Sequence, residues 1–147
     1  MTVPLFLIPM VVGLVTQAVK PLLNRKWYAL LEKDGQKIPR YGGMPSAHTA
    51  FVVSLATTVA LVDGLASTSF AISVAMVIFI LDDALRMRIF LSRHGRALKL
   101  LVRRLPEHEQ HDYPYLEARL GHKLQEVIVG GLVGIFLTWL LFRLLVG

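Results

Sequence analysis

The sequence has 147 residues, of which 54% are hydrophobic and none is cysteine, and its mean hydropathy is +0.57. This composition excludes a disordered or multidomain chain, a disulfide scaffold, thiolate zinc sites and cysteine nucleophiles, and it predicts one membrane domain over residues 1–147. A net charge of +6 can attract nucleic acid, but Lys and Arg in a membrane chain usually set its orientation and meet anionic headgroups. We therefore expect membrane lipids, and no nucleic acid, as partners.

Four apolar stretches are candidates for membrane-spanning helices, because a helix needs about 20 residues to cross the hydrocarbon core. They cover residues 3–23, 49–62, 64–81 and 127–142. The second and fourth reach this length only with polar flanking residues, which places His48 and His122 near the membrane surface. The unbroken apolar runs disfavour barrel strands, and the first stretch lacks the features of a cleaved signal peptide. We predict an all-α fold: an integral membrane bundle of about four transmembrane helices.

The basic residues are distributed very unevenly between the two sides of such a bundle. Polar segments at residues 24–43 and 86–121 lie on one side, and the short turn at Asp63 and Gly64 lies on the other. Of the 16 Lys and Arg residues, all but Arg143 fall on the side of the polar segments. By the positive-inside rule that side is cytoplasmic. We expect a protein of a bacterial inner membrane, with both termini outside and its active site facing the cytoplasm.

The second polar segment contains a pattern of its own. In residues 91–105, apolar side chains and basic side chains each recur at helical spacing. This pattern predicts a basic amphipathic helix lying on the headgroups. Residues 107–115, with two prolines nearby, predict a loop that returns the chain to the last helix.

Several unusual polar residues converge on the cytoplasmic face under this topology. Ionisable groups within or at the rim of a membrane bundle are costly unless paired, so they are functional candidates. Gln17 and Lys20 are three residues apart and share a face at the end of the first helix, where Pro21 ends or kinks it. An isolated lysine at this position would more commonly extend to the headgroups.

The string GGMPSAHTA at residues 42–50 predicts a helix start that attracts phosphate. Its glycines free the backbone, Pro45 suits the first turn, and Ser46 supplies a hydroxyl beside the unsatisfied amides at Ala47 and beyond. His48 would lie within one turn of a bound anion, where it could donate a proton to a leaving oxygen. The alternative interpretation is a capped helix followed by an interfacial histidine.

A cluster of charges ends the third apolar stretch, at Asp82, Asp83, Arg86 and Arg88. Spacings of three and four allow structural ion pairs within one helix. The paired aspartates could instead hold Mg²⁺, with only Glu126 as an additional carboxylate.

The start of the last helix carries a histidine and a carboxylate at helical spacing. His122 and Glu126 are four residues apart, so the carboxylate can accept from one ring nitrogen and leave the other as a nucleophile. An isolated pair of this kind is as often a surface ion pair. The glycines at 130, 131 and 134 permit close helix packing.

Taken together, these motifs resemble those of the type 2 phosphatidic acid phosphatases and the related vanadium haloperoxidases. The string MPSAHT is similar to their PSGHT motif, and the order of motifs resembles that of the divergent, short bacterial and plant branch of this superfamily. The residues that carry the resemblance are Gln17, Lys20, Gly42 to His48, Asp83, Arg88, Gly121, His122, Glu126, Val127 and Gly130.

The resemblance implies a phosphatase that needs no metal or other cofactor and forms a phosphohistidine intermediate. His122 would be the nucleophile, Glu126 would orient it, and His48 would be the general acid. The larger superfamily has an arginine six residues before the nucleophile, where this chain has Leu116. The implied phosphate-binding residues are Lys20, Gln17, Ser46, Ala47 and an arginine at 86, 88 or 119 (Arg86, Arg88, Arg119), with Asp82, Asp83, Gly43 and Gly121 in support.

The predicted function is therefore a membrane lipid phosphate phosphatase. Phosphatidate, phosphatidylglycerol phosphate and polyprenyl phosphates or diphosphates all fit as substrates. Two alternatives stay open: a non-enzymatic lipid-binding or assembly protein that retains a polar site, and a metal-dependent lipid phosphotransferase that uses Asp82 and Asp83. Whether the chain forms a homo-oligomer also stays open.

Overall fold

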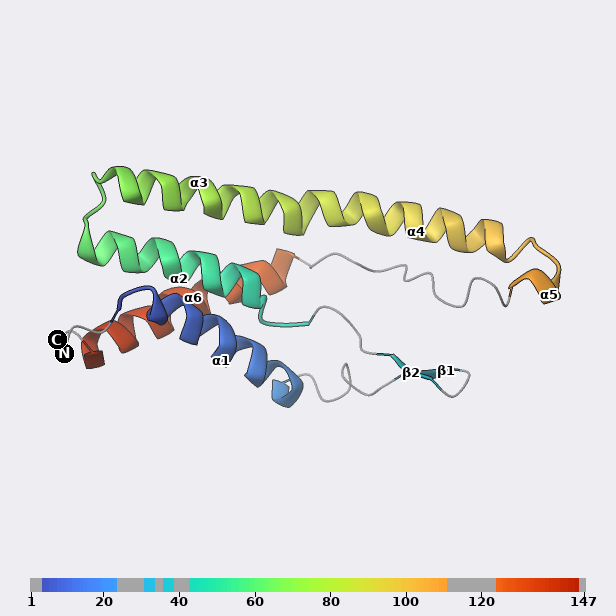
Figure 1. Ribbon diagram of the computed structural model, residues 1–147, viewed down its shortest axis with the longest axis horizontal. Coiled ribbons are helices and arrows are strands. Elements are labelled where there is room, and N and C mark those ends of the chain that lie inside the picture. The colour runs from blue at the N-terminus through green and yellow to red at the C-terminus, as the bar shows by residue number, and fades with distance from the viewer. Residues whose placement is uncertain (1–3, 24–30, 34–35, 39–42, 111–123, 146–147) are drawn as a thin grey trace.

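The computed structural model describes residues 4–23, 31–33, 36–38, 43–110 and 124–145. Helices α1, α3 and α6 pack around α2 to form the bundle, in which α1 begins and α6 ends at the same end (Figure 1). The elements in chain order are α1 (Leu7–Leu23), β1 (Leu31–Lys33), β2 (Gln36–Ile38), α2 (Ala47–Val62), α3 (Thr68–Asp82), the π-helical turn η1 (Asp83–Met87), α4 (Arg88–Val102), α5 (Glu107–Gln110) and α6 (Leu124–Leu145).

Two helical runs are long and apolar enough to cross a membrane. They are the continuous run from Thr68 to Val102 and helix α6, while α1 and α2 are shorter apolar helices of 17 and 16 residues. Large apolar side chains such as Leu14, Phe79 and Phe136 are more than 60% exposed on the outside of the bundle. An exposed apolar surface of this extent is what a lipid environment requires. The prediction of an all-α membrane bundle is confirmed.

Two short elements in the polar connections differ from the predictions. Strands β1 and β2 form an antiparallel hairpin in which Leu31 pairs with Ile38 and Lys33 with Gln36. The sequence Asp-Gly between the two strands is a strong signal for a two-residue hairpin, although the three-residue strands are too short and too polar to stand out in the sequence. Helix α5 occupies the start of the segment that was predicted to be a loop.

The third helix is longer than predicted. The sequence predicts that it ends within the charged segment at residues 82–88, with a separate amphipathic helix at 91–105. Instead, α3 continues through η1 into α4, which begins at Arg88 and extends the line of α3 beyond the end of the other helices (Figure 1). The physical reason is that residues 68–94 contain neither glycine nor proline, so nothing stops the helix. The amphipathic helix is present, but lying flat on the headgroups would need a bend at η1.

Helix α2 is the centre of the bundle, since it packs against α1, α3 and α6. Its interface with α6 is built from small residues that repeat every fourth position. A Cβ added to Gly130 would lie 2.5 Å from the Ser46 carbonyl oxygen, and one added to Gly134 would lie 2.6 Å from that of Ala50. Only glycine permits such close approach of two helix backbones. A Cβ on Gly131 would meet ordinary van der Waals contacts, so two of the three predicted packing glycines are required.

The same interface fixes the direction of the two helices. Thr138 Oγ1 lies within hydrogen-bond distance of Ser54 Oγ and also of the Gly134 carbonyl oxygen, at 2.7 Å. Positions 46, 50 and 54 of α2 therefore meet 130, 134 and 138 of α6 in the same order, which means that the helices run parallel. Two parallel helices begin at the same end of the bundle, and that end holds the candidate site.

Candidate functional site

The start of α2 is a capped helix, in which Pro45 lies just before the N-cap residue and not in the first turn as predicted. Gly43 has φ of +94°, in the left-handed region that favours glycine. Ser46 is the N-cap residue and is fully buried; its Oγ accepts hydrogen bonds from the Thr49 backbone N–H (3.4 Å) and from Thr49 Oγ1 (2.9 Å). A serine at this position satisfies an amide that has no partner within the helix. The cap thus holds the first turn of α2 in place.

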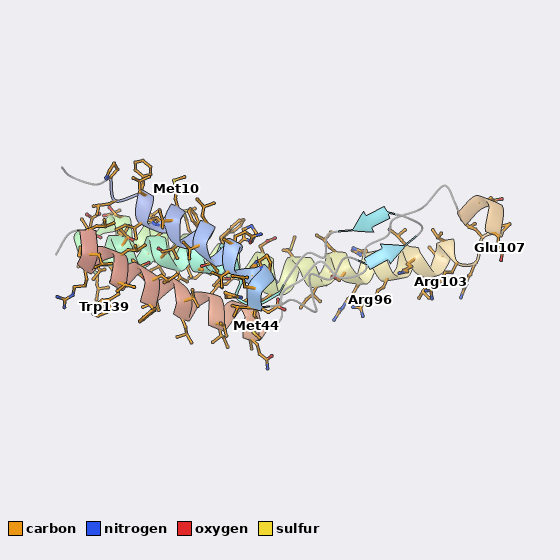
Figure 2. All side chains as sticks on the ribbon, turned by 90° about the horizontal axis from the view of Figure 1, so that it is seen from below. Met10, Met44, Arg96, Arg103, Glu107 and Trp139 are labelled. Atoms are coloured by element: carbon orange, nitrogen blue, oxygen red, sulfur yellow. The ribbon has the colours of Figure 1, made fainter. Side chains whose placement is uncertain are left out.

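The starts of α2 and α6 are joined by a direct hydrogen bond. The Ser46 backbone N–H donates to the Glu126 carbonyl oxygen over 2.9 Å. Because the helices are parallel, the positive ends of both helix dipoles lie at this end of the bundle, where they favour an anion. Figure 2 shows Met44, just before α2, at the end of the bundle from which α4 projects.

A buried pair of opposite charges lies at the same end. Lys20, in the last turn of α1, is 5% exposed, and Glu126, in the first turn of α6, is 7% exposed. Their charges interact favourably. Buried charges are costly unless paired, so this arrangement keeps both side chains inside the bundle. Three helices thereby bring Lys20, Ser46 and Glu126 together.

Gln17 and His48 lie at the surface of the bundle. Both side chains are exposed, whereas Lys20 is buried, so Gln17 and Lys20 differ in burial although they are only three residues apart on α1. The buried position one turn before Lys20 belongs to Thr16, which is 2% exposed and whose Oγ1 donates to the Val12 carbonyl oxygen over 2.6 Å. The residues that sequence analysis missed are therefore hydroxyls, Thr16 and Thr49. The sequence does contain a signal for each: Thr16 is four residues before Lys20 and Thr49 is three residues after Ser46, so each shares a helix face with its partner.

The cluster of charges that begins at the end of α3 contains an exposed ion pair. Arg86 Nε lies 3.1 Å from Asp82 Oδ1, four residues before it, and both side chains are largely exposed. The structural ion pair that the spacing allowed is therefore present. Among the described residues, no group of three or more His, Cys, Asp or Glu side chains could hold a metal ion. Along the long axis, the junction of α3 and α4 lies level with the starts of α2 and α6 (Figure 1).

Four predicted site residues cannot be placed in this geometry. Gly121, His122 and Arg119 lie outside the described residues, and so does the side chain of Arg88, although its backbone begins α4. Ala47 is buried at the first position of α2, and Asp83 is half-buried at the first position of η1. The roles of all these residues stay predictions.

Known proteins share sequence similarity with most of this chain. Residues 1–137 match the Divergent PAP2 family. The chain is also 35% identical, over 119 residues, to the uncharacterized membrane protein YuiD of Bacillus subtilis (strain 168), a match that covers 74% of this chain and 75% of that protein. No solved structure matches the chain significantly. The match over most of its length shows that this membrane protein belongs to the Divergent PAP2 family.

Proposed function

We propose that this chain is a membrane lipid phosphate phosphatase that works through a phosphohistidine and needs no metal. The observation that supports the proposal most strongly is the meeting of two parallel helix starts at Ser46 and Glu126, beside the buried Lys20. Three features that each favour an anion are thus combined at one end of the bundle. The apolar tail of the substrate would stay in the lipid beside the bundle.

Phosphate would bind at the first turn of α2, against its amides and the Lys20 ammonium. The carboxylate of Glu126 already compensates part of the charge of Lys20, so a second cation has to contribute. Arg86, Arg88 and Arg119 are the candidates, and Arg86 would have to leave Asp82 to do so. Each well-placed cationic or N–H contact to the equatorial oxygens typically contributes about 10² to 10³ in rate.

The chemistry would proceed in two balanced steps. A ring nitrogen of His122 attacks phosphorus, the bond from phosphorus to the lipid oxygen breaks, and His48 gives its proton to the departing alkoxide. Water then attacks the phosphohistidine and gives its proton to His48, which releases phosphate and restores both histidines. An exposed position of His48 at the rim of the bundle is compatible with proton exchange with solvent.

The orientation of the site belongs to the same proposal. The excess of Lys and Arg on the side of Lys20 and Ser46 favours a cytoplasmic site in a bacterial inner membrane. Phosphatidate, phosphatidylglycerol phosphate and polyprenyl phosphate or diphosphate remain the candidate substrates.

The proposal is tested by phosphate release from each of these lipids, with the full chain purified in detergent and a chelator present. We expect His122→Ala to abolish turnover and covalent phosphoenzyme. His94→Ala is the matched control, because His94 is an exposed histidine of α4 away from the helix starts, and it should keep activity. Labelled phosphoenzyme in His122→Ala, or activity that disappears with chelator, would contradict the mechanism.

The role of His48 is tested by the choice of leaving group. His48→Ala should lose much less rate on a nitrophenyl phosphate, which needs little protonation, than on a lipid phosphate. Equal losses on both substrates would remove the case for His48 as the general acid.

One observation favours a second candidate function, a non-enzymatic lipid-binding or assembly protein. The charge of Glu126 acts favourably on Lys20, and Thr49 Oγ1 donates to Ser46 Oγ, as expected of a polar network that only supports the fold. This candidate predicts that lipid phosphates bind to the purified protein but that none of them releases phosphate.

A further inference from the structure

Helix α4 carries an apolar face that is exposed. Phe90, Leu91, Leu98 and Leu101 are 50%, 53%, 50% and 59% exposed, and their spacing places them on one side of the helix. On the bundle helices, such side chains face lipid. On a helix that projects straight beyond the bundle, they would face water, which is unfavourable.

The opposite face of α4 carries most of its basic residues, together with Leu100, which is 61% exposed. Arg96, Lys99 and Arg103 recur at spacings of three and four, and Figure 2 shows Arg96 and Arg103 on the same side of the helix. Residues 84–106 contain no aspartate or glutamate, so these charges have no acidic partner on their own helix. Arg93 lies over the ring of Phe90, 5.8 Å from its centroid, at the boundary between the two faces.

The position of η1 places α4 at a membrane surface. Helix α3 and η1 together hold 20 residues, and a helix of this length spans about 30 Å, the thickness of the hydrocarbon core. Helix α4 therefore begins where the core ends. A π-helical turn is also a place where helices bend, because its hydrogen bonds depart from the regular α-helical pattern.

We propose that α4 bends away from α3 at η1 and docks on the bilayer surface of its own membrane, with anionic lipid headgroups as its partner. Phe90, Leu91, Leu98 and Leu101 would enter the boundary between headgroups and acyl chains, while the basic face would contact the negative charges. This surface goes beyond the proposed phosphatase activity and does not depend on it.

Charge complementarity selects anionic lipid among the surfaces that could cover this face. The five cations Arg93, Arg96, Lys99, Arg103 and Arg104 would repel the same helix of a second copy, whereas an anionic leaflet attracts them. Helix α3 also anchors α4 beside the bilayer, so α4 does not have to reach the membrane from solution before it docks.

The absence of cysteine from the sequence allows a direct measurement of where α4 lies. The full chain with Leu98→Cys carries a spin label and is reconstituted into bilayers of phosphatidylcholine, with or without phosphatidylglycerol. Accessibility to oxygen, which concentrates in lipid, is compared with accessibility to a nickel chelate, which stays in water. Arg96→Cys reports on the basic face, and Ser67→Cys, at the start of α3, is the control at the other end of the bundle.

In anionic bilayers we expect the label at position 98 to favour oxygen and the label at 96 to favour the nickel chelate. Replacing Lys99, Arg103 and Arg104 by glutamine should weaken docking roughly fivefold per charge, or about a hundredfold in total, since each cation near an anionic surface contributes roughly equally. Salt at about 1 M should act in the same direction, because it shortens the screening length to about 3 Å. Position 67 should change in none of these conditions.

Three results would overturn the proposal. Strong nickel accessibility at both 96 and 98 in anionic bilayers would show that α4 stands in water. Low accessibility of position 98 to both reagents would show that protein, from this chain or a second copy, covers the apolar face. Equal lipid contact with and without phosphatidylglycerol would show that anionic headgroups are not the partner.

Discussion

The interface between α2 and α6 and the continuous run of α3, η1 and α4 differ in what stabilises them. The first is made of small residues, and the backbones are so close that an added Cβ on Gly130 or Gly134 would clash with carbonyl oxygens. The second is a long helix whose large apolar side chains are mostly exposed, with Ser73 as the buried residue of α3. In a membrane, close packing and buried hydrogen bonds hold helices together, whereas apolar side chains alone do not, because lipid is equally apolar. The site lies on the closely packed part.

The largest loss of stability should come from changing the buried charges at the end of the bundle where α2 and α6 begin. Lys20→Met leaves the Glu126 carboxylate buried without its cation, and breaking a buried pair typically costs about 3 to 5 kcal/mol. We expect a loss of this size in the free energy of unfolding, measured by titration with a denaturing detergent. The double variant Lys20→Met, Glu126→Gln should recover most of it. Additive losses in the double variant would show that the two charges do not compensate each other.

The next largest effect should come from the closest backbone contact. Gly130→Ala places a methyl group 2.5 Å from the Ser46 carbonyl oxygen, and overpacking of this kind costs about 1 to 3 kcal/mol. The matched control is Gly131→Ala, whose added Cβ meets only side-chain atoms at 3.9 and 4.0 Å. Similar unfolding free energies for the two variants would mean that α2 and α6 are farther apart than described.

A smaller effect is expected from the hydroxyl contact in the middle of the same interface. Thr138→Val removes the group that reaches Ser54 Oγ, and interhelical hydrogen bonds of this type contribute about 0.6 kcal/mol on average. Thr57→Val is the control, because Thr57 Oγ1 donates to the Val53 carbonyl oxygen of its own helix. Unfolding curves in the same detergent series should separate the two variants, and an equal shift would argue against a role for the contact between helices.

The smallest loss of stability should come from a change in the exposed run of α3, η1 and α4. Asp82→Asn breaks the ion pair with Arg86, and exposed pairs at this helical spacing contribute about 0.3 to 0.5 kcal/mol, less at high salt. The stability of Asp82→Asn should therefore be almost the same as that of the unmodified chain. A loss as large as that of Lys20→Met would indicate that η1 packs against the site and that Asp82 belongs to it.

The sequence was sufficient to predict the helices of the bundle and the start of α2, because apolar runs and the Pro-Ser cap act locally. It was also sufficient to bring Ser46 and Glu126 to one end, since that follows from topology alone. It did not reveal that Gln17 faces outward while Thr16 and Lys20 face inward, because α1 is apolar on most of its circumference and its polar residues do not define the packed face. The continuity of α3 and α4 was missed because a change from apolar to basic composition was interpreted as a boundary, although composition does not stop a helix.

The parallel pairing of α2 with α6 also has a consequence for the order of events during synthesis. The residues that meet at Ser46 and Glu126 are 80 positions apart, which at about 5 to 20 residues per second corresponds to roughly 4 to 16 seconds of translation. During that interval α2 is already made, but the helix that fits its small-residue face is not. The pairing at Ser46 therefore forms only after translation has passed Glu126, and a chain arrested earlier carries the first half of the site without the second.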